Sequence, residues 1–191
     1  MTQLDQALHV AQLAKKDGID PETVLAALFQ DIGHVCPPPE GSTETVDEDE
    51  DANSAFDYRM HGANYLRSLG FPKKTCELVE SDVMGRRYMA AIIPVYEESL
   101  SSARGPLSST EACEFEKDPL FKEKVKLVQW NDAAKVTEDK PSALDTYRGI
   151  AFGTLAMEYY NQQHSSQANM ELTKDELAQL DKEYGIKEED L

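Results

Sequence analysis

The polar side chains that could do chemistry lie at three points of the chain. Asp31 and His34 belong to the stretch LFQDIGHV, Asp82 and Arg86 belong to SDVMGRRY, and Asn131 follows the only tryptophan. If Asp31 and Asp82 share a pocket of low dielectric, both cannot ionise easily, so one becomes an acid beside a base. Such a pair would move protons on a bound metabolite, as isomerases, dehydratases and cyclases require. Alternatively, Asp31 only accepts hydrogen bonds from backbone amides at its helix end.

Helices are expected to position these side chains. Residues 3–17 carry apolar side chains at helical spacing until Gly18. Asp20-Pro21-Glu22 is typical of a helix start, and this second helix is predicted to run through VLAALFQDI to Gly33.

The remaining helices follow from capping residues and apolar spacing. One helix is predicted over 55–69, and another begins at Pro72 and places Cys76, Val79 and Val83 on one face. Further helices are predicted to begin at the capping box Ser108–Glu111 and at Pro119, and the last core helix is predicted over 142–160. Alternating β-branched residues are absent almost everywhere, so the predicted fold class is all-α. Trp130, Tyr147 and Phe115 are interpreted as core residues.

One domain and a tail account for the 191 residues. The domain covers residues 1–165, with a disordered acidic loop at 37–53, PPPEGSTETVDEDEDAN, that could bury nothing. The tail, 166–191, contains a second capping box at Thr173–Glu176 and is predicted to form a short acidic helix.

The amino-acid composition restricts the kinds of molecule that the chain is expected to bind. The net charge of −17 repels phosphate backbones and anionic lipid, so nucleic-acid and membrane-surface binding are not expected. No stretch has the length of an apolar membrane span, and MTQLDQALHV lacks a signal-peptide pattern. The three cysteines have no CxxC spacing, which is typical of free thiols in a reducing compartment, and a cytoplasmic location is expected.

Five motifs follow one another in the order seen in HD-domain oxygenases: VLAALFQDIGH, HGANYLRSLGF, RRY, FEKDPLF and WNDAAK. Over residues 4–150 the chain resembles the 2-amino-1-hydroxyethylphosphonate-type dioxygenases, which are distant relatives of myo-inositol oxygenase. The resemblance implies an all-helical HD-domain bundle. In that family the bundle holds a mixed-valent di-iron centre, ligated by histidines and aspartates, that uses O2 to cleave or hydroxylate small oxygenated substrates.

The same resemblance implies where the iron ligands would lie, and only Asp31 keeps the family's residue. The family's histidines fall on Gln6, Gln30, Tyr58 and Asp82, and its final aspartate falls on Asn131. Iron is held well by imidazole and carboxylate, whereas amide oxygens are weak neutral donors. The resemblance therefore predicts a degenerate site that holds no cofactor.

Polar residues at all five replaced positions leave two interpretations open: a self-satisfied hydrogen-bond network or a pocket for a polar ligand. In the second, the ligand-binding residues are Gln6, Gln30, Tyr58 and Asn131, with His34, which the family keeps near its substrate. Arg86 falls where the family places a lysine that meets the substrate's anionic group. Its guanidinium would hold a phosphonate, phosphate or carboxylate by two parallel hydrogen bonds, or else pair with a surface acid.

Other metal sites remain open. His9, His34 and His61 each lie three positions after a family ligand position, so a site displaced by one helical turn is conceivable. The carboxylates that could hold a harder ion such as Mg²⁺ are Asp31, Asp82 and Asp132.

Three functions are consistent with the sequence. The first is metal-independent binding of, or acid–base chemistry on, a small oxygenated or anionic metabolite, for example in a biosynthetic pathway. The second is an iron-dependent oxygenase with unusual ligands, acting on an organophosphonate-like or polyol substrate. The third is a non-catalytic interaction domain whose acidic loop and tail meet a basic partner, although the sequence identifies no protein partner.

Overall fold

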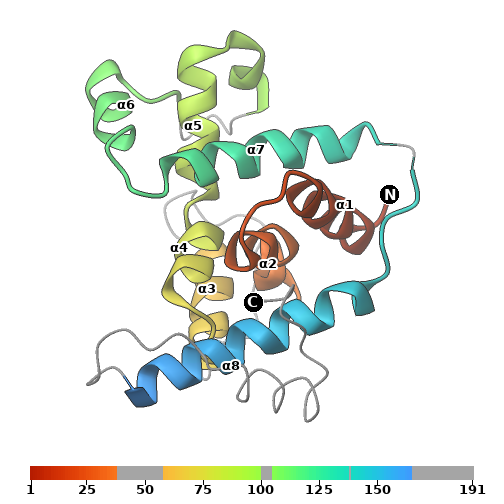
Figure 1. The fold of residues 1–191 in the computed structure, drawn as a ribbon. Coiled ribbons are helices and arrows are strands. Elements are labelled where there is room, and N and C mark those ends of the chain that lie inside the picture. Colours follow the sequence, from red (N-terminus) through yellow and green to blue (C-terminus); the bar gives the residue numbers. More distant parts are fainter. Residues whose placement is uncertain (38–57, 100–104, 138, 165–191) are drawn as a thin grey trace.

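A computed structural model describes residues 1–37, 58–99, 105–137 and 139–164 of the chain. Within these ranges the regular structure is helical and no strand is present, which confirms the predicted all-α bundle (Figure 1). The α-helices are α1 (Gln3–Lys16), α2 (Pro21–Phe29), α3 (Tyr58–Ser68), α4 (Lys73–Glu80), α5 (Asp82–Ile92), α6 (Ser109–Phe115), α7 (Phe121–Lys135) and α8 (Arg148–His164). The 3₁₀ helices are η1 (Ile32–His34), η2 (Pro94–Ser99) and η3 (Leu144–Tyr147). None of the helices in the described ranges is long and apolar enough to cross a membrane.

The helix ends follow local capping chemistry. The Asp20 side chain accepts a hydrogen bond from the Thr23 backbone amide, with Pro21 at the first helical position of α2. Ser108 and Glu111 form the predicted capping box of α6. Gly18 and Gly70 follow α1 and α3 with φ of 68° and 86°, a left-handed conformation that glycine adopts without steric cost.

The structure corrects three predicted helix boundaries. The α-helical part of α2 ends at Phe29, and the chain tightens into η1 before Val35, because Gly33 packs backbone against backbone on α3. The helix expected from Pro72 through Val83 is broken at Ser81 into α4 and α5. The last core helix begins later than expected, since residues 144–147 form η3, and it continues to His164.

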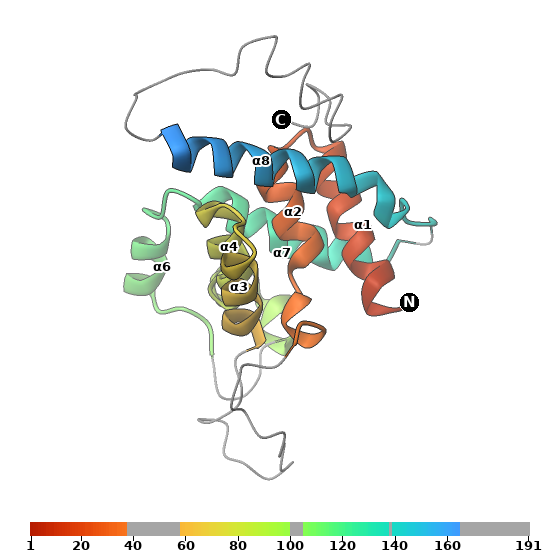
Figure 2. The same cartoon turned by 90° about the horizontal axis from the view of Figure 1, so that it is seen from below.

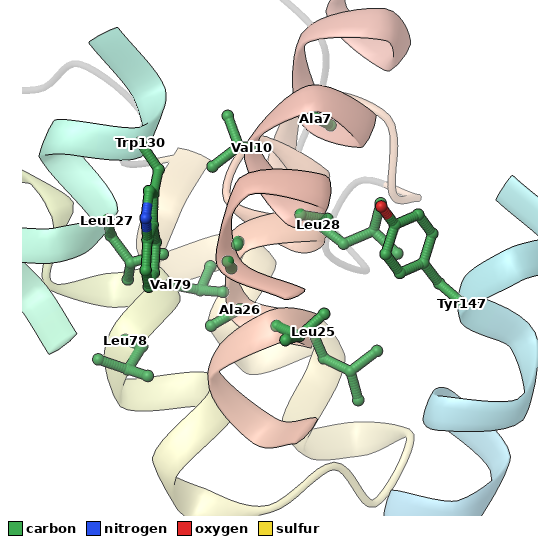
Figure 3. Packing of buried hydrophobic residues seen from close by; sticks show 14 of the residues in the cluster. Ala7, Val10, Leu25, Ala26, Leu28, Leu78, Val79, Leu127, Trp130 and Tyr147 are labelled. Carbon is green, nitrogen blue, oxygen red and sulfur yellow. The ribbon is translucent and has the colours of Figure 1, made fainter. Parts of the chain in front are cut away.

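Helices α1 and α2 lie between α7 and α8 (Figures 1 and 2). The main core fills the space around α2, where Leu25, Ala26 and Ala27 are completely buried (Figure 3). Trp130 of α7 and Tyr147 of η3 pack into this core from opposite sides, as predicted. Each large apolar side chain buried in this way contributes roughly 1.5–3 kcal/mol by leaving water.

A smaller core lies between α5, α6 and α7. Tyr88 and Met89 of α5 pack there against Phe115 of α6 and Val128 of α7. Gly85 allows this close approach, because a Cβ atom at that position would lie 2.9 Å from the Lys124 carbonyl oxygen. The contact fixes α5, which carries Asp82 and Arg86, against α7, which carries Asn131.

Candidate functional site

Three amide side chains from three helical segments meet in the interior. The Nε2 group of Gln6 in α1 donates to the Oδ1 atom of Asn131 in α7 at 2.6 Å. The Nε2 group of Gln30, directly after α2, donates to the same oxygen at 3.4 Å. Asn131 is 4% exposed and Gln30 is 8% exposed. We call Gln6, Gln30 and Asn131 the amide cluster.

The helix packing explains why these amides meet. Val10 lies one turn after Gln6 in α1 and points toward Trp130 and Leu127 of α7 (Figure 3). At the other end of α1, the Trp130 indole N–H donates to the Asp17 carboxylate at 3.0 Å, and this bond lowers the pKa of Asp17. These contacts fix α7 along α1, so Gln6 faces Asn131.

The hydrogen bonds of the amide cluster meet at one atom of Asn131. Both bonds of its side chain to described residues run through Oδ1, which has two lone pairs. Over the described residues, the fully enclosed side-chain N or O atom that lacks a partner is Thr154 Oγ1, so the Nδ2 group of Asn131 is not sealed off.

Asp31 follows the amide cluster directly and begins the turn into η1. Its backbone has φ −109° and ψ 15°, and its half-buried side chain makes no capping hydrogen bond to η1. The alternative in which Asp31 only caps a helix end therefore gains no support from η1. The acid–base pairing of Asp31 with Asp82 stays a prediction, since the Asp82 side chain lies outside the described part of the structure.

Tyr58 and His34 form an aromatic pair beside η1. Their rings are stacked, with centroids 4.3 Å apart and an interplanar angle of 23°. Gly33 and Gly62 bring η1 onto α3, because a Cβ atom on Gly33 would lie 1.7 Å from the Tyr58 carbonyl oxygen. Tyr58 is 38% exposed, so it is not part of the buried amide cluster.

Arg86 lies one turn after Asp82 in α5 and is half-buried. Its positive charge is close enough to Tyr96 of η2 to act on the phenol, whose pKa is raised by burial and by a hydrogen bond to the Asp132 carboxylate. Sequence reasoning missed Tyr96, since a tyrosine after Ile93-Pro94 carries no catalytic pattern. Tyr96, Asp132 and Arg86 form a second polar group next to the amide cluster along α7.

A separate cleft of about 680 Å³ opens between α3, α4, α5 and the start of α7. Its charged walls are ion pairs: Arg67 with Glu80, Lys73 with Glu77, and Lys124 with Asp118. None of the residues predicted to bind a ligand lines it. The cleft is therefore distinct from the predicted site.

The donor set of the described residues does not fit a metal ion. No group of three histidine, cysteine or carboxylate side chains gathers there. His9 is buried in α1, His34 stacks on Tyr58, and His61 donates to the Pro37 carbonyl oxygen at 2.8 Å, so the displaced histidine site is not formed. Asp132 is bound by Lys135 at 2.8 Å, and the Asp31–Asp82–Asp132 alternative is untested because the Asp82 side chain is not described.

Comparison with known proteins shows that the chain is similar to a viral protein and to two bacterial enzymes. It is 29% identical over 157 residues to an uncharacterized protein of Acanthamoeba polyphaga mimivirus, covering 78% of this chain and 69% of that protein. It is 31% identical over 159 residues to the hydroxymethylphosphonate dioxygenase of Gimesia maris, covering 77% of this chain and 74% of the enzyme. It is 30% identical over 146 residues to the glycine-betaine-forming [1-hydroxy-2-(trimethylamino)ethyl]phosphonate dioxygenase of Leisingera caerulea, covering 71% of this chain and 69% of the enzyme.

No model of a protein family matches the sequence. Given these identities over more than two thirds of two enzymes, the chain belongs to the family of the organophosphonate dioxygenases.

Proposed function

We propose that this chain is an HD-domain member of the family with a degenerate metal site, and that it binds a small hydroxylated acid without a metal ion. The observation that carries the proposal is the amide cluster. Gln6 and Gln30 both donate to Asn131 where the resemblance implies iron ligands. Neutral amides cannot replace imidazole and carboxylate as iron donors, so their convergence supports the loss of the metal site.

The ligand class follows from the groups around the amide cluster. The Nδ2 group of Asn131 would donate to a hydroxyl or carbonyl oxygen, and Arg86 would pair with an anionic head group. The two relatives act on phosphonates that carry a hydroxyl group on the carbon next to phosphorus, by their names. A 1-hydroxyalkylphosphonate supplies both groups, and the His34–Tyr58 pair would cover one side of it.

Proton transfer is the chemistry that the remaining residues support. The Asp31 carboxylate makes no capping hydrogen bond, so it is available to accept a proton from a ligand carbon or hydroxyl. Asp82 begins α5, one turn before Arg86, and would supply the second carboxyl group. An isomerase or cyclase needs this pair, whereas a binding protein needs only Arg86 and the amide cluster.

A second candidate is an iron-dependent oxygenase with unusual ligands. The names of the two relatives favour it. It requires that ligands from outside the described residues complete a site around Asp31. The third possibility, an interaction domain, depends on the acidic loop and tail, which lie outside the described residues.

Metal analysis and ligand titration separate the candidates. Protein purified without chelators is expected to contain well below one iron atom per chain, and calorimetry with hydroxymethylphosphonate in EDTA is expected to show binding. Arg86→Ala should weaken that binding at least tenfold, while Arg67→Ala, whose guanidinium lies at the separate cleft and pairs with Glu80, should leave it unchanged. Stoichiometric iron with oxygen uptake would establish the oxygenase instead. Iron-free protein that binds no hydroxyphosphonate would favour the interaction domain.

A further inference from the structure

Helix α8 has an apolar face that the described residues leave uncovered. Its inner face buries Ile150, Gly153 and Thr154 against the bundle, where α8 packs on α2 and η3. On the opposite face Phe152 is 44% exposed and Tyr159 is 67% exposed. The helix runs along the edge of the bundle, so this outer face points away from α2 (Figures 1 and 2).

The outer residues have the spacing of a helix-packing seam. Phe152, Leu155, Ala156 and Tyr159 follow one another at intervals of three, one and three residues, so they form a single stripe along the helix. Arg148 continues the stripe by one turn, with its guanidinium 5.6 Å from the centre of the Phe152 ring. A helix with apolar stripes on both sides is typical of one that packs between two partners.

We propose that residues 173–184 of this same chain form a helix that packs antiparallel on the outer face of α8. The sequence from residue 165 to 191 adds 27 residues directly after α8. Within it, the capping box Thr173–Glu176 precedes Leu177, Leu180 and Tyr184, whose spacing again gives one apolar stripe. Gly185 follows as a helix end.

The two stripes match in reverse order. If the chain turns back after His164, Tyr159 faces Leu177, Ala156 faces Leu180 and Phe152 faces Tyr184, since the intervals of three and four residues mirror each other. Arg148 lies one turn before Phe152, at the end of the stripe near which the residues after Gly185 would lie, and these include the acidic Glu188, Glu189 and Asp190. The apolar positions therefore agree on one register, and the charges agree with the antiparallel direction.

The short connection favours this occupant over a second copy of the chain. Residues 165–172 would form the turn, and helix–helix connections of roughly 2–8 residues are usual. A segment joined by such a connection has an effective concentration on the order of millimolar at the face it contacts. A second copy would have to compete with that concentration.

Disulfide trapping in the full chain tests the register. In a background with Cys36→Ser and Cys113→Ser, and with the buried Cys76 kept, the pair Tyr159→Cys with Leu177→Cys should form an intramolecular disulfide on mild oxidation. The matched pair Tyr159→Cys with Gln179→Cys places the second thiol on the opposite side of the proposed helix. We expect it to oxidise at least tenfold more slowly.

The outcomes decide the proposal. Equal oxidation of the two pairs, or no oxidation of either, overturns it. A disulfide between two chains on a non-reducing gel overturns it in favour of a second copy on the outer face of α8. As a second readout, the Tm losses of Phe152→Ala and Tyr184→Ala should be less than additive in the double variant, and strict additivity would contradict the contact.

Discussion

The side chains of Gln6 and Asn131 are 125 residues apart in the sequence, and their amides are joined by a hydrogen bond of 2.6 Å between α1 and α7. Asn131 also accepts a hydrogen bond from Gln30, so its Oδ1 atom connects α1, the end of α2 and α7. Because Asn131 is 4% exposed, water cannot replace these bonds freely. The bonds therefore stabilise the helix arrangement as well as shaping the site.

Asn131→Leu tests this arrangement. The substitution removes the shared acceptor and leaves the buried Gln30 amide without its partner, so the free energy of unfolding should fall by about 1–3 kcal/mol. Urea unfolding followed by far-UV circular dichroism measures it. Gln129→Leu is the control, because Gln129 lies on the exposed side of the same helix. Equal stability of the two variants would mean that the amide cluster contributes nothing.

Gly33→Ala should disrupt the junction of η1 with α3. A Cβ atom there would lie 1.7 Å from the Tyr58 carbonyl oxygen, so the backbone of η1 must move away from α3. We expect a loss of about 1–3 kcal/mol or more, as for other overpacked sites. Gly105→Ala, where a Cβ atom meets nothing within 4 Å, should be close to neutral. Thermal unfolding of both variants makes the comparison.

The Asp20–Lys74 pair should make part of the stability dependent on acid. Burial alone would raise the pKa of Asp20, but hydrogen bonds from Lys74 and Thr23 outweigh it and lower the pKa below the usual value of 3.8. A carboxylate with a lowered folded pKa stabilises the fold above its unfolded pKa, and this contribution disappears as the pH falls through the folded pKa. Asp20→Asn should therefore cost up to about 1 kcal/mol near neutral pH and flatten the dependence below about pH 4. Unfolding curves between pH 7 and pH 2.5 test this, and parallel curves for the two proteins would contradict it.

Tyr96→Phe should affect ligand binding more than stability. The phenol ring stays in the small core, while the hydroxyl that bonds Asp132 is lost. If Tyr96 and Asp132 hold the surroundings of Arg86, the affinity for hydroxymethylphosphonate should fall three- to tenfold, about 0.7–1.4 kcal/mol. Calorimetry measures the affinity, and Tyr88→Phe is the matched control, since its hydroxyl bonds Glu116 at 2.8 Å on the α6 side of α5. An effect equal to that of the control would remove Tyr96 from the site.

Capping residues and apolar spacing predicted most of the fold. Asp20-Pro21, Ser108–Glu111, Gly18 and Gly70 act within one helical turn, so their effect is local and visible in the sequence. The break at Ser81 and the end of α2 at Phe29 were not predicted, because each depends on a helix packed against it. Position 33 requires glycine only because α3 packs so closely there that a Cβ atom would overlap the Tyr58 carbonyl oxygen.

For the candidate site, too, some features were visible in the sequence and others depended on the tertiary structure. The sequence by itself determined that the side chains at Gln6, Gln30 and Asn131 are neutral amides, which are poor donors for iron. Only the tertiary structure decided that Gln6 and Gln30 both bond Asn131, that Tyr58 stacks on His34, and that Tyr96 and Asp132 lie near Arg86. Residue types fix what a side chain can donate or accept, whereas its partner depends on how distant helices pack, and that packing is set by core side chains such as Leu25 and Trp130.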